Sequence, residues 1–409
     1  MIVGLRCVIC GKVYEPDQVE YVCPHHGNEG ILDVIYDYDT LRENVDRDGL
    51  GSDWSMWRYR PLLPVRPDAD VPPLTIGWTP IYEVEPGIWI KDDGREPTAS
   101  FKDRASAIAV VKARERGASI VTTASTGNAA AALSGISASV GQRNVIFVPA
   151  TAPPAKIAQL LVFGSTVFAV EGTYDDAFEL CLEVAGEYGW YNRNTAYNPY
   201  MTEGKKTAAY EIAEQLDWHA PDAVVVSVGD GCIIGGLHKG FKDLLALGWT
   251  ERMPRLIGVQ AAGSNYLAEA WANGENVLTK AAIDAATVAD SISAGLPRDR
   301  IKAMAAVVET DGAYVTVSDE EILDAIPAMA RVSGVFGEPA GAAAYAGFVR
   351  AKELGVLEGH DRVVILNTGS GLKDVASAVR AARMAGAEQH TIKPTLDAAK
   401  AVIDRLEIP

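Results

Sequence analysis

Cysteine is scarce in this chain, with five residues among 409. They are too few and too unevenly placed for a disulfide framework in a chain of this length. Long apolar runs are also missing, because none approaches the roughly 18 residues of a membrane span. The N-terminus lacks the basic-then-apolar pattern of a signal peptide. These absences predict a cytoplasmic protein that does not cross a membrane.

The chain has fewer positively charged residues than negatively charged ones. The chain has 37 Lys and Arg residues against 54 Asp and Glu residues, a formal net charge of −17. This balance, with no basic cluster to interrupt it, opposes broad contact with nucleic acid or with an acidic membrane surface. The hydrophobic fraction of 48% and the charged fraction of 22% are ordinary for a globular protein. A small-molecule substrate is the better expectation.

The first 30 residues hold a pattern typical of a metal site. Three of the cysteines and a histidine are arranged as C-x2-C, twelve residues, then C-x2-H. Two tight turns that each offer two soft ligands favour a structural Zn²⁺ in a tetrahedral site. The alternative is a small hairpin with reduced thiols and no metal. The predicted ligands are Cys7, Cys10, Cys23 and His26.

From residue 105 onward, segments of helical periodicity alternate with short apolar segments. Predicted strands cover residues 120–123, 145–148, 167–170, 223–228, 256–260, 314–317 and 363–366. Predicted helices cover residues 105–116, 127–140, 155–163, 174–188, 235–246, 265–272, 318–332, 340–354 and 372–384. The alternation predicts an α/β fold with parallel sheets covered by helices on both faces. We divide the chain into a zinc-ribbon-like module (1–32), a connector (33–74) and a catalytic part of two α/β lobes (75–409), the smaller lobe at about 105–195.

One lysine stands out in the octet of residues 97–104, Pro-Thr-Ala-Ser-Phe-Lys-Asp-Arg. Lys102 lies between a turn and a predicted helix, so we expect it at a helix N-terminus. The unpaired N–H groups and the macrodipole there lower the pKa of an ammonium group, as burial also does. A neutral amine attacks carbonyl carbons. Lys102 is therefore the predicted nucleophile.

Three predicted strands end in loops suited to a ligand, and in α/β sheets ligands sit at such ends. Ser125, Thr126 and Gly127 favour binding of a carboxylate, and Asn128 beside them can orient a phenolic oxygen. The second loop favours a phosphate and comprises Gly229, Asp230, Gly231, Cys232 and Ile233. The third loop is Asn-Thr-Gly-Ser-Gly-Leu-Lys-Asp at residues 367–374, where a hydroxyl can meet a ring nitrogen.

A nicotinamide cofactor is the alternative for the glycine-rich loop. The pattern G-x-G-x-x-G fails there, because its sixth position is Ile234. A lysine nucleophile, a phosphate loop, an asparagine and a terminal hydroxyl are the parts that hold pyridoxal 5'-phosphate. We therefore predict this cofactor.

Five motifs in unbroken order over about residues 75–385 resemble the threonine synthase family. That family belongs to the fold-type II, tryptophan synthase β-like, pyridoxal-phosphate enzymes. Some of its members also carry an N-terminal zinc-ribbon-like module. The motifs are the octet at 97–104, Ser-Thr-Gly-Asn at 125–128, Asn-Pro at 198–199 with Glu-Gly-Lys-Lys-Thr at 203–207, Glu-Pro-Ala-Gly-Ala at 338–342 and Gly-Leu-Lys-Asp at 371–374.

The resemblance implies a role for each matching residue. Lys102 is the lysine that carries the cofactor, Asn128 binds its phenolic oxygen, and Thr368 places a hydroxyl at its pyridine nitrogen. The glycine loop becomes the cradle of the cofactor's phosphate. A hydroxyl does not stabilise a protonated pyridine as a carboxylate does, which favours elimination and replacement over transamination. The implied reaction converts O-phosphohomoserine and water to threonine and phosphate.

The chain departs from the family pattern where the substrate phosphate is expected. An arginine usual two residues after the proline is here Met201, and a serine usual two residues before the asparagine is here Ala196. The histidine usual in the last glycine turn is here Ser370. A thioether does not hold a phosphate dianion, so we expect a nearby cation, Lys205 or Lys206, to replace the arginine.

Two other functions remain open at the level of sequence. One is β-elimination or β-replacement on serine, threonine or O-phosphoserine, as in a dehydratase or a cysteate-synthase-like enzyme. The other is a cofactor-binding paralogue without catalysis, which the presence of Lys102 opposes. As partners we expect a small amino-acid substrate and a second copy of the chain in a homodimer.

Overall fold

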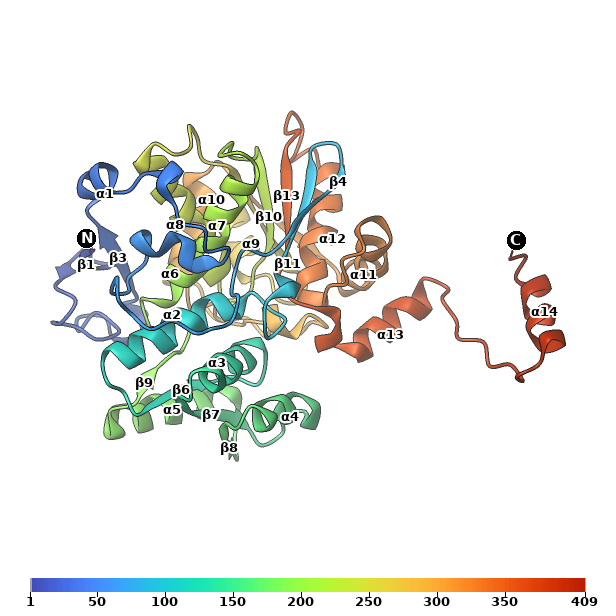
Figure 1. The fold of residues 1–409 in the computed structure, drawn as a ribbon, viewed down its shortest axis with the longest axis horizontal. Helices are drawn as coiled ribbons and strands as arrows, with labels where there is room; N and C mark the ends of the chain where they lie inside the picture. Colours follow the sequence, from blue (N-terminus) through green and yellow to red (C-terminus); the bar gives the residue numbers. More distant parts are fainter. Residues whose placement is uncertain (1, 409) are drawn as a thin grey trace.

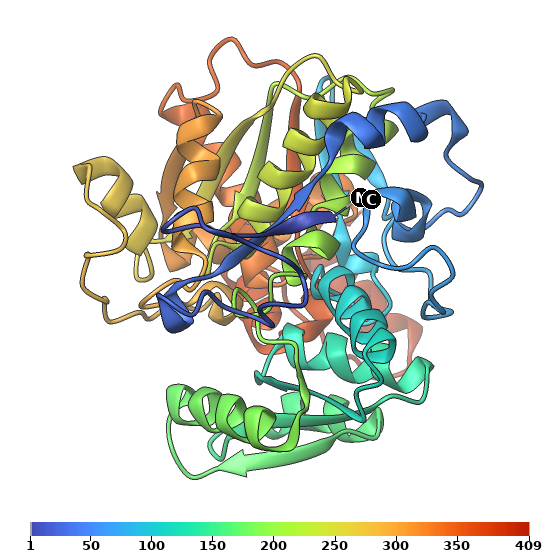
Figure 2. The same ribbon diagram turned by 90° about the vertical axis from the view of Figure 1, so that its left-hand side faces the viewer.

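Three β-sheets organise residues 2–408, the part of the chain that the computed structural model describes (Figure 1). The first is an antiparallel N-terminal sheet in the order β2-β1-β3, made of β1 (Ile2–Cys7), β2 (Val13–Tyr14) and β3 (Leu32–Tyr36). Because β3 pairs with β1 along its whole length, the boundary that we placed after residue 32 runs through this strand. Figure 2 shows this sheet, in dark blue, across the larger lobe.

The smaller lobe carries a four-stranded parallel sheet in the order β8-β7-β6-β9. Its strands are β6 (Ile120–Ala124), β7 (Arg143–Pro149), β8 (Thr166–Val170) and β9 (Tyr191–Asn192). Its helices are α2 (Lys102–Glu115), α3 (Asn128–Ser139), α4 (Pro154–Val162) and α5 (Tyr174–Tyr188). The predicted alternation of strands and helices is confirmed here, and α5 has the predicted bounds.

The larger lobe is built on a six-stranded sheet in the order β12-β11-β10-β13-β5-β4, in which only β4 is antiparallel to its neighbour. Strands β10 and β13 are buried at every position, as expected for parallel strands covered on both faces. The strands are β4 (Ile81–Glu85), β5 (Ile88–Asp92), β10 (Ala223–Ser227), β11 (Arg255–Ala261), β12 (Ala313–Val317) and β13 (Val363–Asn367).

The helices of the larger lobe agree less closely with the predicted ranges. The pattern missed α6 (Met201–Lys205), α7 (Thr207–Gln215) and α10 (Arg300–Glu309), and α8 (Cys232–Leu247) begins three residues before the predicted start. Glycines 235 and 236, at the start of the predicted helix, lie inside α8. A Cβ atom on Gly236 would come within 2.7 Å of the Cβ of Lys205, so this glycine lets α8 pack closely on α6. The remaining helices are α9 (Tyr266–Asn273), α11 (Asp319–Ser333), α12 (Pro339–Glu353) and α13 (Val375–Met384).

The connector, residues 33–74, contains regular secondary structure, although we predicted no helix or strand in it. It contains α1 (Tyr38–Asn44) and a 3-10 helix at Met56–Leu62, whose Trp57 and Tyr59 are buried. These aromatic residues belong to the main hydrophobic core, because they pack on the body of the molecule.

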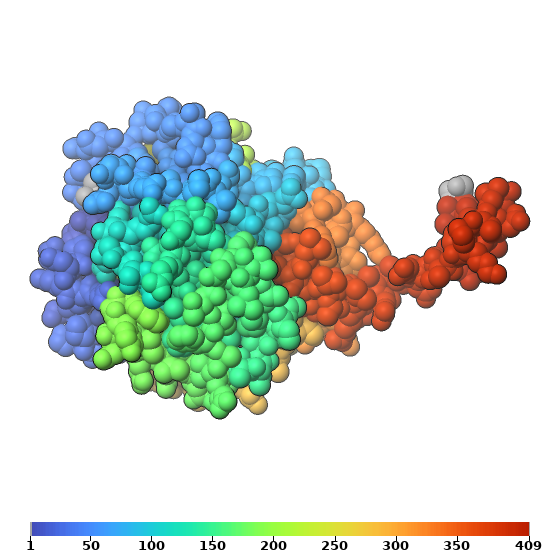
Figure 3. Space-filling view, turned by 60° about the horizontal axis from the view of Figure 1, so that its bottom comes forward, coloured from blue at the N-terminus to red at the C-terminus, as the bar shows by residue number. Residues whose placement is uncertain are grey.

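The C-terminal segment leaves the body of the molecule (Figure 3). It follows α13 and ends in α14 (Leu396–Arg405), none of whose residues is buried. We call residues 386–408 the C-terminal arm. Among residues 2–408, no helix combines the length and the apolar character that crossing a membrane requires.

Candidate active site

Lys102 is the first residue of α2, as predicted, and lines a cavity of about 710 Å³. The turn before it is fixed by Ala99, which has a left-handed φ of 66°, and by the amide of Phe101, which donates to the carbonyl oxygen of Thr368 at 3.0 Å. Left-handed conformations of non-glycine residues are costly and concentrate at functional sites. Burial lowers the pKa of Lys102, although the nearby Glu338 carboxylate opposes this shift. The environment thus favours the neutral, nucleophilic amine.

The glycine loop offers a cradle of unpaired donors to this cavity. Among residues 2–408, no protein atom accepts a hydrogen bond from the backbone N–H groups of residues 229–233, all of which line the cavity. The loop opens the sixteen-residue helix α8 through Gly231, whose φ of 91° is available to glycine. Unpaired amides at a helix N-terminus bind phosphate. The loop therefore fits the phosphate of pyridoxal phosphate.

The loop between β6 and α3 lines the same cavity with Ser125, Thr126, Gly127 and Asn128. The Oγ atom of Ser125 accepts a hydrogen bond from the amide of Gly127 at 3.2 Å. Asn128 donates from Nδ2 to Oε1 of Glu338 at 2.7 Å, so its position is fixed from the larger lobe. The two lobes thus present Lys102, the unpaired amides of residues 229–233 and this polar loop to one cavity.

Two other predicted residues lie outside the cavity-lining set. Thr368 is buried next to the start of α2 through its carbonyl contact with Phe101, and its role at the pyridine nitrogen stays a prediction. The Nζ atom of Lys206 lies 2.7 Å from Glu203 Oε2 and 2.8 Å from Asp243 Oδ2. We correct the prediction for Lys206, because two buried carboxylates already neutralise this lysine. Lys205 lines the cavity instead.

The sequence reasoning missed two charged residues at the site. Arg193 lines the cavity and follows β9, a strand of two residues that is too short to show periodicity. Glu338 contacts Asn128 and shifts the pKa of Lys102. Glu338 is the first residue of one of the five motifs, so the sequence did mark it. We assigned it no role, because the spacing of the motif does not indicate one.

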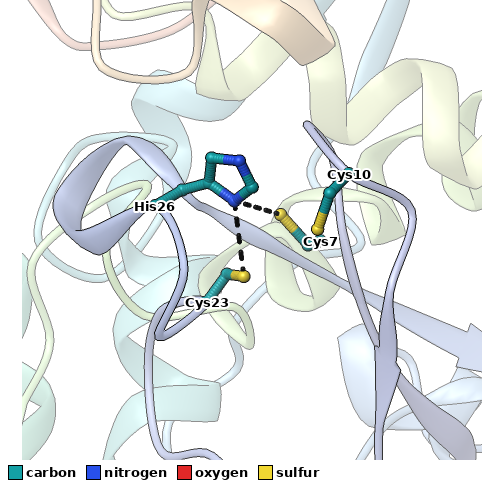
Figure 4. Close-up of side chains that lie close together, drawn as sticks. All are labelled: Cys7, Cys10, Cys23 and His26. Carbon is teal, nitrogen blue, oxygen red and sulfur yellow. Dashed lines mark hydrogen bonds between the residues drawn. The ribbon is translucent and has the colours of Figure 1, made fainter.

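The four predicted metal ligands meet in the N-terminal module (Figure 4). All their ligand atoms lie within 4.8 Å of one another. The Nδ1 atom of His26 faces Cys23 Sγ at 3.5 Å and Cys7 Sγ at 3.8 Å. Tyr14 lies 3.0 Å from Cys23 Sγ through its hydroxyl, an outer contact of the kind that orients metal ligands. Three thiols and one imidazole are compatible with a structural zinc site.

This module also forms one wall of the cavity. Asn28, Glu29 and Ile31, just after the ligand His26, line it. Ile31 packs with Ala196 and Cys232, which come from the two loops that face the cavity. The N-terminal module therefore contributes to the shape of the cavity.

We expect zinc removal to weaken substrate binding and to leave the cofactor in place. The wall at residues 28–31 would loosen, whereas Lys102 and the phosphate cradle lie in the lobes. KM should rise about tenfold, equivalent to about 1.4 kcal/mol of lost contacts. Metal content, KM and cofactor absorbance would be measured before and after chelation, with zinc re-addition as the control. Well under one zinc per chain before chelation would refute the site.

The comparisons with known proteins agree with this geometry. The family model described as "Pyridoxal-phosphate dependent enzyme" matches residues 73–369. The threonine synthase of Methanocaldococcus jannaschii is 36% identical over 386 residues, covering 92% of this chain and 94% of the relative. That of Methanosarcina acetivorans is 38% identical over 387 residues, covering 92% and 93%.

Solved structures support the fold. The processed form of threonine deaminase isoform 2 from Solanum lycopersicum superimposes with a TM-score of 0.64 at 23% identity, covering 75% of this chain and 88% of that one. Maize serine racemase gives a TM-score of 0.61 at 19% identity, covering 75% and 92%.

Two α/β lobes around a lysine and a phosphate cradle are the architecture of a fold-type II pyridoxal-phosphate enzyme, which confirms the predicted fold and cofactor. The chain belongs to the pyridoxal-phosphate dependent enzyme family and, within it, to the threonine synthase family.

Proposed function

We propose that the enzyme converts O-phosphohomoserine and water to threonine and phosphate. The observation that carries this proposal is the identity of 36–38% to threonine synthases over more than nine-tenths of both chains. The cavity supports it, since a cofactor lysine, a phosphate cradle and a polar loop for a carboxylate face one space.

Each residue has a role in this proposal. Bound pyridoxal phosphate would supply the electron sink for the negative charge that develops when protons leave Cα and Cβ of the substrate. Lys102, as a neutral amine, removes protons from Cα and Cβ and returns protons to Cγ and Cα, so that Cγ becomes a methyl group once its phosphate has left and water supplies the hydroxyl group at Cβ. The loop of Ser125, Thr126 and Gly127 binds the substrate carboxylate, Asn128 orients the phenolic oxygen, and Thr368 lies at the pyridine nitrogen. The amides of residues 229–233 hold the cofactor's phosphate.

Product analysis tests the reaction. We expect purified holoenzyme to release phosphate and form threonine from O-phosphohomoserine, because the relatives share its chain over nearly full length. Serine, threonine and O-phosphoserine would be assayed in parallel for 2-oxo acids. Formation of a 2-oxo acid from them, with no phosphate from O-phosphohomoserine, would reject this function in favour of β-elimination.

We also propose that the protein is a homodimer and that its C-terminal arm packs on the second copy. Helix α14 exposes Leu396, Ile403 and, just after it, Leu406. An isolated helix of ten residues is marginal in water, so it needs a surface to pack on. Deletion of residues 387–409 should lower the mass measured by light scattering from two chains to one. A dimer that persists would show that the arm is not the contact.

The cytoplasm is the proposed location. The described cysteines are all free, including the buried Cys181 and Cys232 of the lobes. Free thiols persist in reducing compartments. Amino-acid biosynthesis, the role proposed here, fits the same compartment.

A further inference from the structure

Two cations in the cavity lack a carboxylate partner, although both are almost fully buried. Seven lysines and arginines are buried among residues 2–408. Five of them form ion pairs, namely Lys91, Arg104, Lys206, Lys239 and Arg300. For Arg193 and Lys205, each 1% exposed, no described carboxylate oxygen lies within 4.0 Å. A buried charge without a partner is costly, which points to an anion that is brought by a ligand.

Arg193 is held rigidly with one nitrogen left free. Its Nε atom donates to Ser106 Oγ at 3.2 Å, and Nη1 donates to Thr195 Oγ1 at 3.0 Å. Its Nη2 atom is buried and has no hydrogen-bond partner. Ser106 lies one turn after Lys102 on α2, so the guanidinium is fixed beside the helix that begins at the reactive lysine.

Lys205 stands one helical turn after Met201. Residues four apart share a face of a helix, so Lys205 presents a cation on the face where the family pattern has its arginine. Among residues 2–408, the only hydrogen bond of its Nζ atom goes to the carbonyl oxygen of Met201 at 3.3 Å. The carboxylate of Asp299 is nearby but beyond ion-pair distance. Both oxygens of this carboxylate are buried without a hydrogen-bond partner among residues 2–408, its Oδ1 atom lies 3.9 Å from Lys302 Nζ, and Asp299 does not line the cavity.

Burial removes the charged groups of Lys205 and Arg193 from water, which disfavours their charged forms. Burial lowers the pKa of Lys205 to about 8 and that of Arg193 to about 10. An anion placed between them would stabilise both charged forms.

We propose that Arg193 and Lys205 form a two-cation pocket that binds the phosphate group of the substrate. The pocket takes the place of the arginine of the family pattern, whose position Met201 occupies in this chain. The identity of the substrate rests on the proposed function. The amides of residues 229–233 remain for the cofactor's phosphate, so the two phosphate groups have separate donors. Arg193 and Lys205 thereby select a phosphorylated amino acid over a neutral hydroxy-amino acid.

Inorganic phosphate is the probe, because it tests the pocket without turnover. Its affinity for cofactor-loaded protein would be measured by calorimetry for wild type, Arg193→Gln and Lys205→Gln. Lys242→Gln is the control, since Lys242 is half-exposed, pairs with Glu309 and lies outside the cavity. We expect wild type and control to bind alike and each pocket variant to bind at least about tenfold more weakly. Cofactor affinity should change less than about threefold.

The alternative source of phosphate is the cofactor. If the pocket variants lose cofactor affinity and the remaining holoenzyme binds inorganic phosphate as wild type does, the pocket serves the cofactor and the proposal fails. The proposal is also overturned if the pocket variants bind inorganic phosphate and cofactor as tightly as wild type does. It is overturned as well if wild type does not bind inorganic phosphate.

A double variant guards against variants that fail to fold. Met201→Arg in the Lys205→Gln background puts a cation back on the same helix face, and we expect it to recover phosphate affinity to within about threefold of wild type. A folded double variant without recovery contradicts the proposal. If wild-type holoenzyme binds phosphate through this pocket but releases none from O-phosphohomoserine, the proposed function fails and the pocket stands.

Discussion

Replacement of Lys102 by alanine is expected to lower kcat/KM by about 10³-fold or more. A positioned proton carrier contributes about 10² to 10⁴-fold by itself, and the same amine is proposed to hold the cofactor. The visible absorbance band of the bound cofactor should shift or disappear. Steady-state kinetics and absorbance spectra of the two purified proteins would measure both effects.

Lys112→Ala is the matched control. Lys112 lies on the same helix α2 and pairs with Glu115 at 2.8 Å, outside the cavity. Its loss should change kcat/KM less than about threefold. Borohydride reduction of wild type, followed by peptide mass analysis, should find the cofactor on Lys102. The cofactor on another lysine, or near-normal activity of Lys102→Ala, would refute the assignment.

Arg104, the last residue of the octet, is expected to be the largest single contributor to stability that we test. Its Nε atom lies 2.6 Å from Asp93 Oδ2 and 3.3 Å from Glu96 Oε1, and Nη2 donates to Glu211 Oε2 at 2.8 Å. Lys91 Nζ contacts Glu211 Oε2 at 2.7 Å, and all five side chains are fully buried. This cluster ties the strand before the octet to α2 and α7.

Arg104→Met should lower the free energy of unfolding by about 3 to 5 kcal/mol, because it leaves buried carboxylates without their partner. Urea unfolding of cofactor-loaded protein, followed by circular dichroism, would measure the change. The control is Arg350→Ala, which removes an exposed pair with Glu353 and should cost less than about 1 kcal/mol. A loss below 1 kcal/mol for Arg104→Met would show that the cluster is not a source of stability.

Much of the site was readable from local sequence because its signals are local. The position of Lys102 at a helix start follows from a turn before it and periodicity after it. The four metal ligands come in two pairs, each within one turn, so their spacing predicts the cluster that the structure forms. Alternating strands and helices predict parallel sheets, and parallel sheets place their loops at one edge.

The helices that hydrophobic periodicity did not predict show which features local sequence cannot reveal. The segment 201–215 is buried on nearly all sides although it carries many polar residues, among them Glu203, Lys206 and Glu211, so its apolar residues do not form the single stripe that indicates a helix. The sequence also provided no reason for the glycines inside α8, which allow close contact with a neighbouring helix. A Cβ atom on Gly240 would come within 2.4 Å of the carbonyl oxygen of Lys206.

Lys205 and Lys206 mark the division most clearly. The sequence by itself determined that two lysines are adjacent near Met201, and it led to the prediction that one of them binds the substrate phosphate. Only the tertiary structure decided the environment of each lysine, because adjacent residues of a helix point about 100° apart and meet different neighbours. Lys206 meets Asp243, 37 positions away on α8, whereas Lys205 faces the cavity with Arg193. Such pairings depend on how α6 packs between α2 and α8, and no spacing along the chain encodes that packing.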